Sequence, residues 1–272
     1  MKKLIALDLD GTLLKSDHTI GEKTKHILNQ LYNDGHHITI ATGRILQSAT
    51  VIPQMLGFPC HLVACNGAVV FHRENRPVKS HTFSYELVKE IISIMHEEGI
   101  YFHLYTEDTI YCNRIEHTAK AFERSLTESE HSHVKGVFVI DSAEELLAKR
   151  PNIFKFGIYQ DGTYDFNKVR ARFDALEGIE TVFSNTNLLD LMIDGVSKWS
   201  GIDELAKSLG VENENVIVFG DNENDLQMIR GAGVGVVMGN AKESIKAHAN
   251  HITTSNDEDG IYTFLTGYLQ GE

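Results

Sequence analysis

The sequence predicts an α/β protein in which a doubly wound parallel sheet forms the core and an α+β domain is inserted into that core. Strand-helix-strand alternation in the first and last parts of the chain is typical of a parallel sheet covered by helices on both faces. The middle part changes to paired strands with interposed helices, which indicates a largely antiparallel sheet. We therefore expect residues 1–82 and 194–272 to form one discontinuous core and residues 83–193 to form the insertion.

Composition limits the class of protein. At 272 residues, with 42% hydrophobic and 23% charged residues, the chain is typical of a globular protein with one large or two modest domains. The formal charge of −13 and the absence of a clustered Lys/Arg run argue against a nucleic-acid or anionic membrane partner. An anionic substrate must therefore be attracted by a local cation.

Cysteine usage and hydropathy predict a cytoplasmic protein. Cys60, Cys65 and Cys112 cannot all pair, and none of them lies in a CxxC motif. Asp8 interrupts the N-terminal apolar residues too early for a signal peptide. No apolar run approaches the ~20 residues of a membrane span. We therefore expect reduced thiols.

The first predicted strand starts at Leu4 and runs into two carboxylates, Asp8 and Asp10, followed by Gly11. Strand side chains alternate between faces, so the two carboxylates are expected on one side, where they repel unless a cation or a shared proton intervenes. The glycine lets the chain turn away after them. Taken alone, this stretch fits an Asp-Gly hairpin turn equally well. The rest of the chain decides between the two.

A helix and a second strand follow. Ser16–Asp17 offers cap chemistry for a helix whose apolar face continues to Leu31, and Gly35 ends that helix. The strand 36–41 is buried and ends in Thr42, Gly43 and Arg44.

A further helix and a hairpin complete the first part of the core. The helix continues to Leu56, with Pro53 marking a bend or restart and Gly57 the end. The strands 62–65 and 68–71 then flank Asn66–Gly67, a two-residue hairpin signal.

The insertion alternates helices with short strands. We expect helices at 85–98, 115–129, 142–149 and near 165–177. We expect strands at 101–105, 109–112, 137–140, 153–159, 180–184 and 188–193.

Simple alternation then returns for the last part of the core. We expect helices at 199–209, 224–230 and 242–249, strands at 216–219, 234–238 and 251–253, and a C-terminal helix from about 259.

The candidate polar residues of the core lie where predicted strands end or where the next helix begins. In a doubly wound sheet these carboxyl ends share one edge, so the side chains converge. The candidates are Asp8, Asp10, Thr42, Gly43, Lys198, Asp221, Asn224 and Asp225.

This set suits a magnesium-dependent reaction on a phosphate. Asp8, Asp10 and Asp221 offer hard oxygen ligands, and the lack of a Cys/His ligand set favours Mg²⁺ over zinc. Thr42 offers a hydroxyl donor, and the Gly43 amide is expected at a helix N-terminus suited to an anion. Lys198 adds a positive charge for phosphate.

Four motifs occur in order along the core: Asp-Leu-Asp-Gly-Thr at 8–12, Ala-Thr-Gly-Arg at 41–44, Gly-Val-Ser-Lys at 195–198 and Gly-Asp-Asn-Glu-Asn-Asp at 220–225. Together they resemble the four motifs of the haloacid dehalogenase superfamily of phosphatases. The segments 66–68 (Asn-Gly-Ala) and 238–241 (Met-Gly-Asn-Ala), with the large insertion, resemble its Cof-type branch. The resemblance covers essentially the whole core, and the insertion stands where that branch has its cap.

The resemblance implies a division of labour between the two carboxylates of the first motif. Asp8 would be the nucleophile that forms an aspartyl-phosphate. Asp10 would protonate the leaving alkoxide, then activate the hydrolytic water, and give Mg²⁺ a main-chain carbonyl. Asp221 would bind the metal together with them.

The remaining motif residues would hold the phosphate or support the site. Thr42 and Lys198 would hold the transferring phosphoryl oxygens, with the amides of Leu9 and Gly43 helping. Asn224 and Asp225 would support the phosphate, Lys198 or metal-bound water.

One residue departs from the family's pattern. Trp199 follows the lysine of the third motif, where the family usually has a small residue, often Gly. We expect this tryptophan to pack the start of its helix against the core instead of contacting substrate.

The weaker signals have structural explanations. The glycines of 231–235 do not match a dinucleotide loop in register and precede a strand, so we expect tight packing there. The 14 histidines are scattered, and those at 36–37 and 131–133 lack a matching ligand set, so we expect solvated or boundary side chains. The acidic stretch 256–260 is expected to be a solvated entry to the last helix. Asn66 is expected to be a turn residue, with a substrate contact as the alternative.

The sequence therefore predicts a magnesium-dependent phosphatase acting on small cytoplasmic phosphate monoesters, such as sugar phosphates, nucleotides or phosphorylated cofactors. The insertion would close over the site and recognise the leaving group. A phosphomutase or phosphotransferase acting on sugar phosphates shares the aspartyl-phosphate and is the first alternative. A non-catalytic phosphometabolite-binding protein is the second, and a complete set of nucleophile and acid argues against it.

Overall fold

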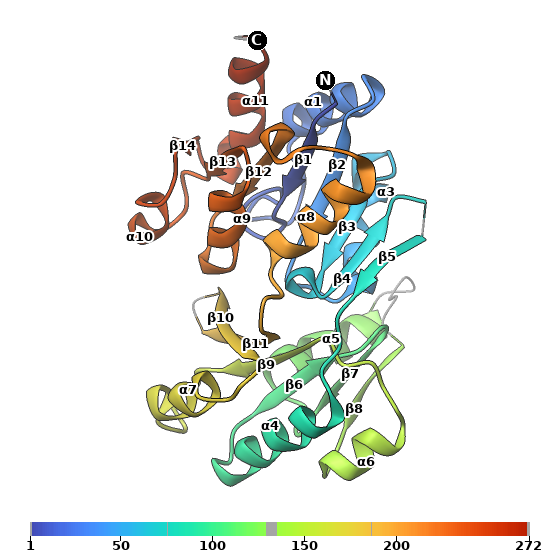
Figure 1. Cartoon of the computed structure of the whole chain (residues 1–272), viewed down its shortest axis with the longest axis vertical. Coiled ribbons are helices and arrows are strands. Elements are labelled where there is room, and N and C mark those ends of the chain that lie inside the picture. Colours follow the sequence, from blue (N-terminus) through green and yellow to red (C-terminus); the bar gives the residue numbers. More distant parts are fainter. Residues whose placement is uncertain (1, 75, 129–134, 186, 271–272) are drawn as a thin grey trace. The chain divides into compact units, whose positions relative to one another are not determined.

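The computed structural model describes residues 2–74, 76–128, 135–185 and 187–270. The chain divides into two compact units. The core unit comprises Met1–Arg44, Ala49–Ser80 and Ser197–Glu272, and the inserted unit comprises Ile45–Ser48 and His81–Val196. Each unit contains its own sheet (Figure 1).

The core unit is built on an eight-stranded sheet in the order β14-β13-β12-β1-β2-β3-β4-β5. The first six strands of this order run parallel, and β4 and β5 are antiparallel additions at one edge. Their bounds are β1 Leu4–Leu7, β2 His37–Ala41, β3 His61–Ala64, β4 Val69–His72, β5 Arg76–Ser80, β12 Val216–Gly220, β13 Val234–Val237 and β14 His251–Ile252. The predicted doubly wound α/β core is confirmed.

Helices cover both faces of this sheet. Val218 of β12 packs with side chains of α8 and α9, whereas its neighbour Phe219 points the other way, to Phe264 of α11. Helix α11 in turn packs against α1. The described helices that lie wholly or partly in the core unit are α1 Glu22–Asn33, α2 Leu46–Ala49, α3 Ile52–Leu56, α8 Lys198–Leu209, α9 Leu226–Gly231, α10 Glu243–Lys246 and α11 Gly260–Gln270.

The inserted unit has a six-stranded sheet in the order β10-β11-β9-β6-β7-β8, antiparallel except for the β7–β8 pair. One face of this sheet packs on α4, α6 and α7 through a core that includes Phe102, Phe156 and Phe173. Ala119 of α5 packs with Tyr101 and Cys112 in a smaller cluster. The elements are α4 Tyr85–Glu97, β6 Phe102–Tyr105, β7 Thr109–Cys112, α5 His117–Glu128, β8 Gly136–Val139, α6 Ala143–Ala148, β9 Lys155–Tyr159, α7 Phe166–Asp174, β10 Ile179–Asn185 and β11 Leu188–Ile193.

The strand β5 is absent from the sequence-based prediction. All but one of its residues are exposed, and its sequence contains Pro77 and two basic residues, so it shows no apolar alternation. An edge strand tolerates proline and charge because one of its sides needs no partner.

Two local predictions in the first part of the core are wrong in detail. Helix α1 begins at Glu22 after Gly21, and Ser16 instead bonds to Asp257 through its amide and hydroxyl. The strands β3 and β4 do pair, but their connection is a 3₁₀ turn, η1 (Cys65–Gly67), with positive φ at all three residues, and not a two-residue turn.

The acidic stretch 256–260 is not simply solvated. Asn256 is buried, Asp257 accepts hydrogen bonds from Ser16, and Asp259 accepts one from Thr24 at 3.0 Å. These bonds join the start of the last helix to α1 and to the segment before it. The acidic residues are structural acceptors, a role that no local pattern distinguishes from solvation.

The expectation for the histidines is also wrong at several positions. The structure brings His37, His61 and His72 together on adjacent strands, with 3.4 Å between His61 Nε2 and His37 Nδ1 and 4.6 Å between the ring centres of His61 and His72. His61 and His103 have no exposed surface. The histidines at 131–133 lie outside the described residues.

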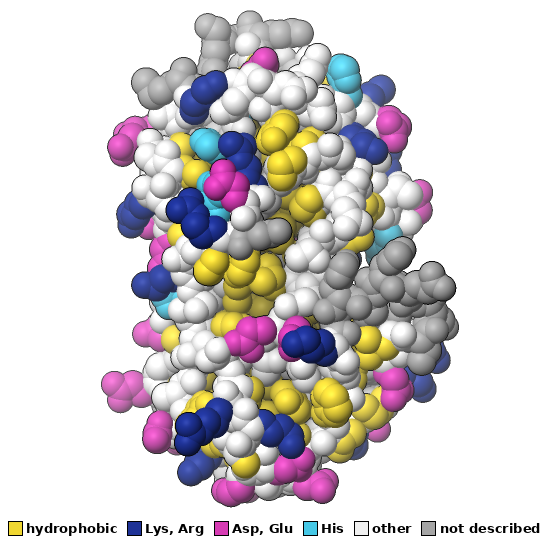
Figure 2. Space-filling model, turned by 90° about the vertical axis from the view of Figure 1, so that its right-hand side faces the viewer, with side chains coloured by type: hydrophobic (Ala, Val, Ile, Leu, Met, Phe, Trp, Pro, Cys, Tyr) yellow, Lys and Arg dark blue, Asp and Glu magenta, His cyan; other side chains and the backbone are white. Residues whose placement is uncertain are grey.

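Charged side chains, cysteines and helix hydropathy bear on the expectations drawn from composition. On the face shown in Figure 2, Lys and Arg side chains lie among Asp and Glu side chains. The cysteines Cys60, Cys65 and Cys112 are buried, and none of these three forms a disulfide. Within the described ranges, no helix combines the length and the apolar character needed to cross a membrane.

Candidate active site

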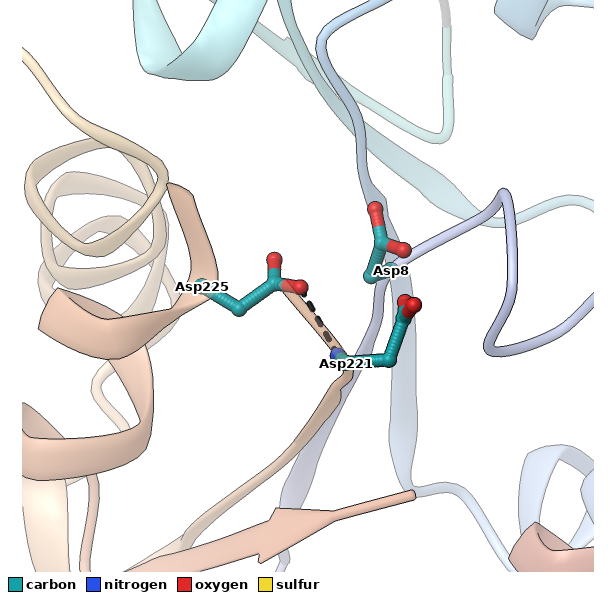
Figure 3. Close-up of side chains that lie close together, drawn as sticks. All are labelled: Asp8, Asp221 and Asp225. Atoms are coloured by element: carbon teal, nitrogen blue, oxygen red, sulfur yellow. Dashed lines mark hydrogen bonds between the residues drawn. The ribbon is translucent and has the colours of Figure 1, made fainter. Parts of the chain in front are cut away.

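The carboxyl ends of β1 and β12 bring two aspartates together. The two strands pair in parallel, with Leu7 opposite Phe219, and the Asp8 amide donates to the Phe219 carbonyl at 3.0 Å. Asp8 therefore leaves β1 beside the point where Asp221 leaves β12. The carboxylates of Asp8 and Asp221 lie next to each other in Figure 3.

Lys198 joins the first and fourth motifs. Its Nζ lies 2.6 Å from Asp8 Oδ1 and 2.7 Å from Asp225 Oδ1, and all three side chains are buried. The other oxygen of Asp225 accepts the amides of Asp221 and Asn222, at 2.9 and 3.0 Å. Asp225 thereby ties the lysine to the loop that carries Asp221.

The start of α8 positions this lysine. Ser197 is the N-cap, and it forms a reciprocal capping box with Ser200. A positive charge in the first helical turn is unfavourable with respect to the helix dipole. The carboxylates of Asp8 and Asp225 offset this cost and hold Lys198 in place.

Two glycines allow the close approach of the motif loops. Gly11 has φ +86°, and a Cβ there would lie 2.6 Å from Asp221 Oδ2. A Cβ at Gly220 would lie 2.5 Å from the Cβ of Asp225. Thr12 Oγ1 donates to Asp221 Oδ1 at 3.0 Å, so the first motif also orients the carboxylate of the fourth.

The crowding of charges shifts the pKa values. Burial, followed by the charge of Asp225, raises the pKa of Asp8 well above its usual range. The same two causes raise the pKa of Asp221 to about 6. Burial alone would lower the pKa of Lys198, but Asp225 and Asp8 outweigh it and raise that pKa. These shifts favour the charged form of Lys198 and disfavour the ionised forms of Asp8 and Asp221.

The site fits a divalent cation. Asp8, Asp221 and Asp225 each offer an oxygen, and these oxygens lie within 4.8 Å of one another (Figure 3). Three carboxylates against one ammonium leave two negative charges when all are ionised. Because both oxygens of Asp225 already accept bonds from Lys198 and the loop amides, Asp8 and Asp221 are the carboxylates that can face a cation.

The side chain of Asp10 lies outside this group. Its two oxygens bind the guanidinium of Arg44, with 2.8 Å from Nε to Oδ2, and the carboxylate is half-exposed. Arg44 belongs to the second motif, but the sequence pattern assigns no role to its side chain. The pairing joins the ends of β1 and β2, which no sequence pattern reveals.

Thr42 and Gly43 follow β2 as predicted, but Gly43 is not at a helix N-terminus. Helix α2 begins only at Leu46, so Gly43 lies in the bend that precedes it. Thr42 is buried, and its Oγ1 accepts the Arg44 amide at 3.1 Å. Leu9 is fully buried, and its carbonyl accepts the amide of Leu14 at 2.9 Å.

The 3₁₀ turn after β3 packs against the start of α8. A Cβ at Gly67, where φ is +98°, would lie 1.9 Å from the Ser197 carbonyl oxygen. This close approach buries Asn66, whose Oδ1 accepts a hydrogen bond from Asn224 Nδ2 at 3.1 Å. Asn66 is therefore joined to the fourth motif and is more than an isolated turn residue.

Trp199 and the glycines of the segment 231–235 are packing residues, as expected. A Cβ at Gly231 would lie 2.3 Å from the indole of Trp199, so the ring occupies the space that the glycine leaves. The indole is partly buried against the core cluster between α8 and α9. Gly235 similarly lies against the Ile229 carbonyl, which a Cβ would approach to 2.0 Å.

The chain matches known proteins over almost its whole length. A family model described as haloacid dehalogenase-like hydrolase matches residues 5–265. The chain is 32% identical over 279 residues to the 5-amino-6-(5-phospho-D-ribitylamino)uracil phosphatase YitU of Bacillus subtilis (strain 168), covering 98% of this chain and 97% of that protein. It is 31% identical over 282 residues to phosphatase YwpJ of the same organism, covering 95% and 97%.

A solved structure shares the fold. A haloacid dehalogenase-like hydrolase from B. subtilis matches with a TM-score of 0.83 and 29% sequence identity, over 97% of this chain and 99% of that chain. The fold, the four motifs and the named relatives agree. The chain therefore belongs to the haloacid dehalogenase-like hydrolases, as a Cof-type phosphatase that acts on phosphate monoesters.

Proposed function

We propose that this protein is a magnesium-dependent phosphatase in which Asp8 attacks phosphorus and forms an aspartyl-phosphate. The observation that supports this most strongly is the buried contact of Asp8 with Lys198, at the same sheet edge as Asp221. Lys198 orients the attacking carboxylate and offers positive charge to a phosphoryl group. Asp225 keeps Lys198 in place.

Magnesium would be held by Asp8, Asp221 and the main-chain carbonyl of Asp10, and it would reduce the repulsion between Asp8 and an anionic phosphoryl group. The adjacent Asp8 and Asp221 carboxylates support this assignment, because burial, followed by the charge of Asp225, raises the pKa of both. Their oxygens are also hard ligands, which suit magnesium.

Asp10 is proposed to transfer the protons. It would donate to the leaving oxygen and later accept a proton from the attacking water. Because Arg44 binds both oxygens of Asp10, at least one of these bonds must open during the reaction.

The other motif residues are proposed to hold the substrate. Thr42, Gly43, Leu9, Lys198 and Asn224 would bind phosphoryl oxygens. Asn66, through its bond to Asn224, would support that group or contact substrate directly. Donors from several loops would then surround the transferring group.

The substrate is proposed to be a small cytoplasmic phosphate monoester: a sugar phosphate, a nucleotide or a phosphorylated cofactor. The insertion, predicted at 83–193 between the core segments 1–82 and 194–272, would act as the cap that recognises the leaving group. The similarity to YitU, named for a phosphorylated ribitylaminouracil, supports a phosphorylated metabolite of that size.

The test of the mechanism is Asp8→Asn with 4-nitrophenyl phosphate and MgCl₂. We expect a folded protein without turnover, while Asp34→Asn, a matched change at an exposed position of the core unit, stays fully active. Acid quenching of the wild type during turnover should leave phosphate on the peptide that contains Asp8. Wild-type-like turnover by Asp8→Asn would overturn the proposed mechanism.

A metabolite panel identifies the substrate class and separates hydrolysis from transfer. The panel contains sugar phosphates, nucleotides, pyridoxal 5′-phosphate and the ribitylaminouracil phosphate, each tested with magnesium. In ¹⁸O-water a phosphatase places the label in the released phosphate. A phosphotransferase would pass the phosphoryl group to a sugar without labelling it.

A further inference from the structure

Polar contacts hold one side of the segment that follows Asp10. Backbone bonds close its turn, from the Leu13 amide to the Asp8 carbonyl at 3.1 Å and from Leu14 to Leu9 at 2.9 Å. Beyond the turn lies a polar cavity of about 320 Å³, whose lining includes Asp10, Gly11 and Asn240. Leu13 and Leu14 of this segment are buried, and hydrogen bonds from other residues that line the cavity add to that packing.

Asn240 supplies one of these hydrogen bonds. Its Nδ2 donates to the Gly11 carbonyl at 2.9 Å, and its Oδ1 accepts the amide of Asn256 at 3.1 Å. The neighbouring Gly239 allows this reach, because a Cβ there would lie 2.9 Å from the Ser255 amide nitrogen. The Met-Gly-Asn-Ala segment at 238–241 thus brings a side-chain amide to the residue directly after Asp10.

Asn256 supplies the second. Its Nδ2 donates to the carbonyl of Leu14 at 2.8 Å, and the side chain is buried. The two asparagines are themselves joined through the Asn256 amide. The two side chains therefore bind the turn at the carbonyls of Gly11 and Leu14. These positions lie on either side of Thr12, whose hydroxyl donates to Asp221.

This arrangement bears on Asp10 through the backbone. Gly11 has positive φ and carries no side chain, so the direction of the peptide that joins Gly11 to Thr12 depends on what binds the Gly11 carbonyl. A displacement of about 1 Å at a catalytic group can lower a rate by about 100-fold. A small rotation at Gly11 would move Asp10 by such an amount.

We propose that Asn240 and Asn256 are positioning residues for the phosphatase reaction: their side-chain amides bind the carbonyls of Gly11 and Leu14 and hold the segment that carries Asp10. This inference rests on the proposed role of Asp10 as the proton donor. Neither asparagine touches the substrate in this role.

The experiment uses the leaving group as the readout. Proton donation matters greatly for an alkoxide and little for 4-nitrophenolate, which leaves without a proton at neutral pH. The substitutions Asn240→Asp and Asn256→Asp keep the shape of the side chain but remove the NH₂ donor, and Asn240→Leu removes the bonds without adding charge. Asn250→Asp makes the same change at an exposed position of the same region and serves as the control for charge.

We expect each of the three variants to lower kcat on an alkyl phosphate by about 10- to 100-fold. The loss on 4-nitrophenyl phosphate should be less than about threefold, and Asn250→Asp should match the wild type on both substrates. Equal losses on both substrates, tracking a fall in Tm, would show a merely structural role and overturn the inference.

Two variants of the catalytic aspartates distinguish a failure of this inference from a failure of the proposed function. Asp8→Asn tests the nucleophile, and Asp10→Asn should show the selective loss on alkyl phosphates in its strongest form. If Asp10→Asn shows that loss and the asparagine variants do not, only the positioning role fails. If Asp10→Asn loses both substrates equally, the proton-donor role on which this inference rests fails.

Discussion

Lys198 is the only cation, among the residues that the structure describes, that pairs with the buried carboxylates of Asp8 and Asp225. Lys198→Met removes this charge and is therefore a direct test of the site's electrostatics. Methionine keeps most of the volume of the lysine stem while it removes the ammonium. The ammonium lies 2.6 Å from Asp8 and 2.7 Å from Asp225, and its side chain is only 1% exposed. The carboxylates would remain buried without their partner.

The expected loss of stability is large. Removal of one partner of a buried ion pair typically costs about 3–5 kcal/mol, because the remaining charge is left uncompensated. Here one lysine compensates two carboxylates, so the loss should lie at the upper end of that range. Part of it should return when MgCl₂ is added, because a cation bound by Asp8 stabilises the folded state.

The assay is urea unfolding followed by circular dichroism, at pH 7.5 with EDTA. The matched control is Lys207→Met on the same helix, whose ammonium is mostly exposed and pairs with Asp203. That exposed pair should contribute little to stability, because solvent screens it. A Lys198→Met protein that unfolds within about 1 kcal/mol of the control in EDTA would refute the reasoning.

Three further predictions follow from individual contacts. Burial, then the charges of His72 and His37, lowers the pKa of His61 to about 3 from about 6.5 in the unfolded chain. Between those two pKa values only the unfolded state binds this proton, so the free energy of unfolding should fall as the pH drops below about 6.5. His61→Leu should reduce the slope of the free energy of unfolding against pH by about 1 kcal/mol per pH unit, as measured by denaturation at pH 5 and pH 7. Gly67→Ala places a Cβ against the Ser197 carbonyl at a position of positive φ, and should lower stability by more than about 2 kcal/mol and reduce kcat, whereas Gly57→Ala meets nothing nearby and should cost less by thermal unfolding. Removal of magnesium with EDTA should abolish turnover, and isothermal titration should show one divalent-cation site that Asp221→Asn weakens; unchanged turnover in EDTA would contradict the metal assignment.

Local patterns in the sequence correctly indicated much of the fold. Short apolar runs identified the core strands, and their alternation with helices indicated a parallel sheet. Paired strands in the middle of the chain indicated a second, largely antiparallel sheet. The edge strand β5 was not predicted, because Arg76–Ser80 is nearly all exposed and contains a proline. Such a strand exists because β4 offers it a partner, and not because of its own residues.

The same division holds within the site. The predicted strand bounds placed Asp8, Thr42 and Asp221 at strand ends, where a parallel sheet brings such residues to one edge, and Lys198 at the start of a helix. It did not show that Lys198 bridges Asp8 and Asp225, nor that Gly43 lies in a bend before α2.

By itself the sequence determined which residue types stand at the ends of the core strands, and hence the family and the chemistry. Only the tertiary structure decided which of them touch: Arg44 with Asp10, Asn66 with Asn224, and Asn240 with Gly11. Strands and caps depend on neighbours in the chain, so their signals are local. Contacts between distant loops, such as that of Asn240 with Gly11 across 229 residues, depend on strand order and close backbone approach, which exist only once the sheet has formed.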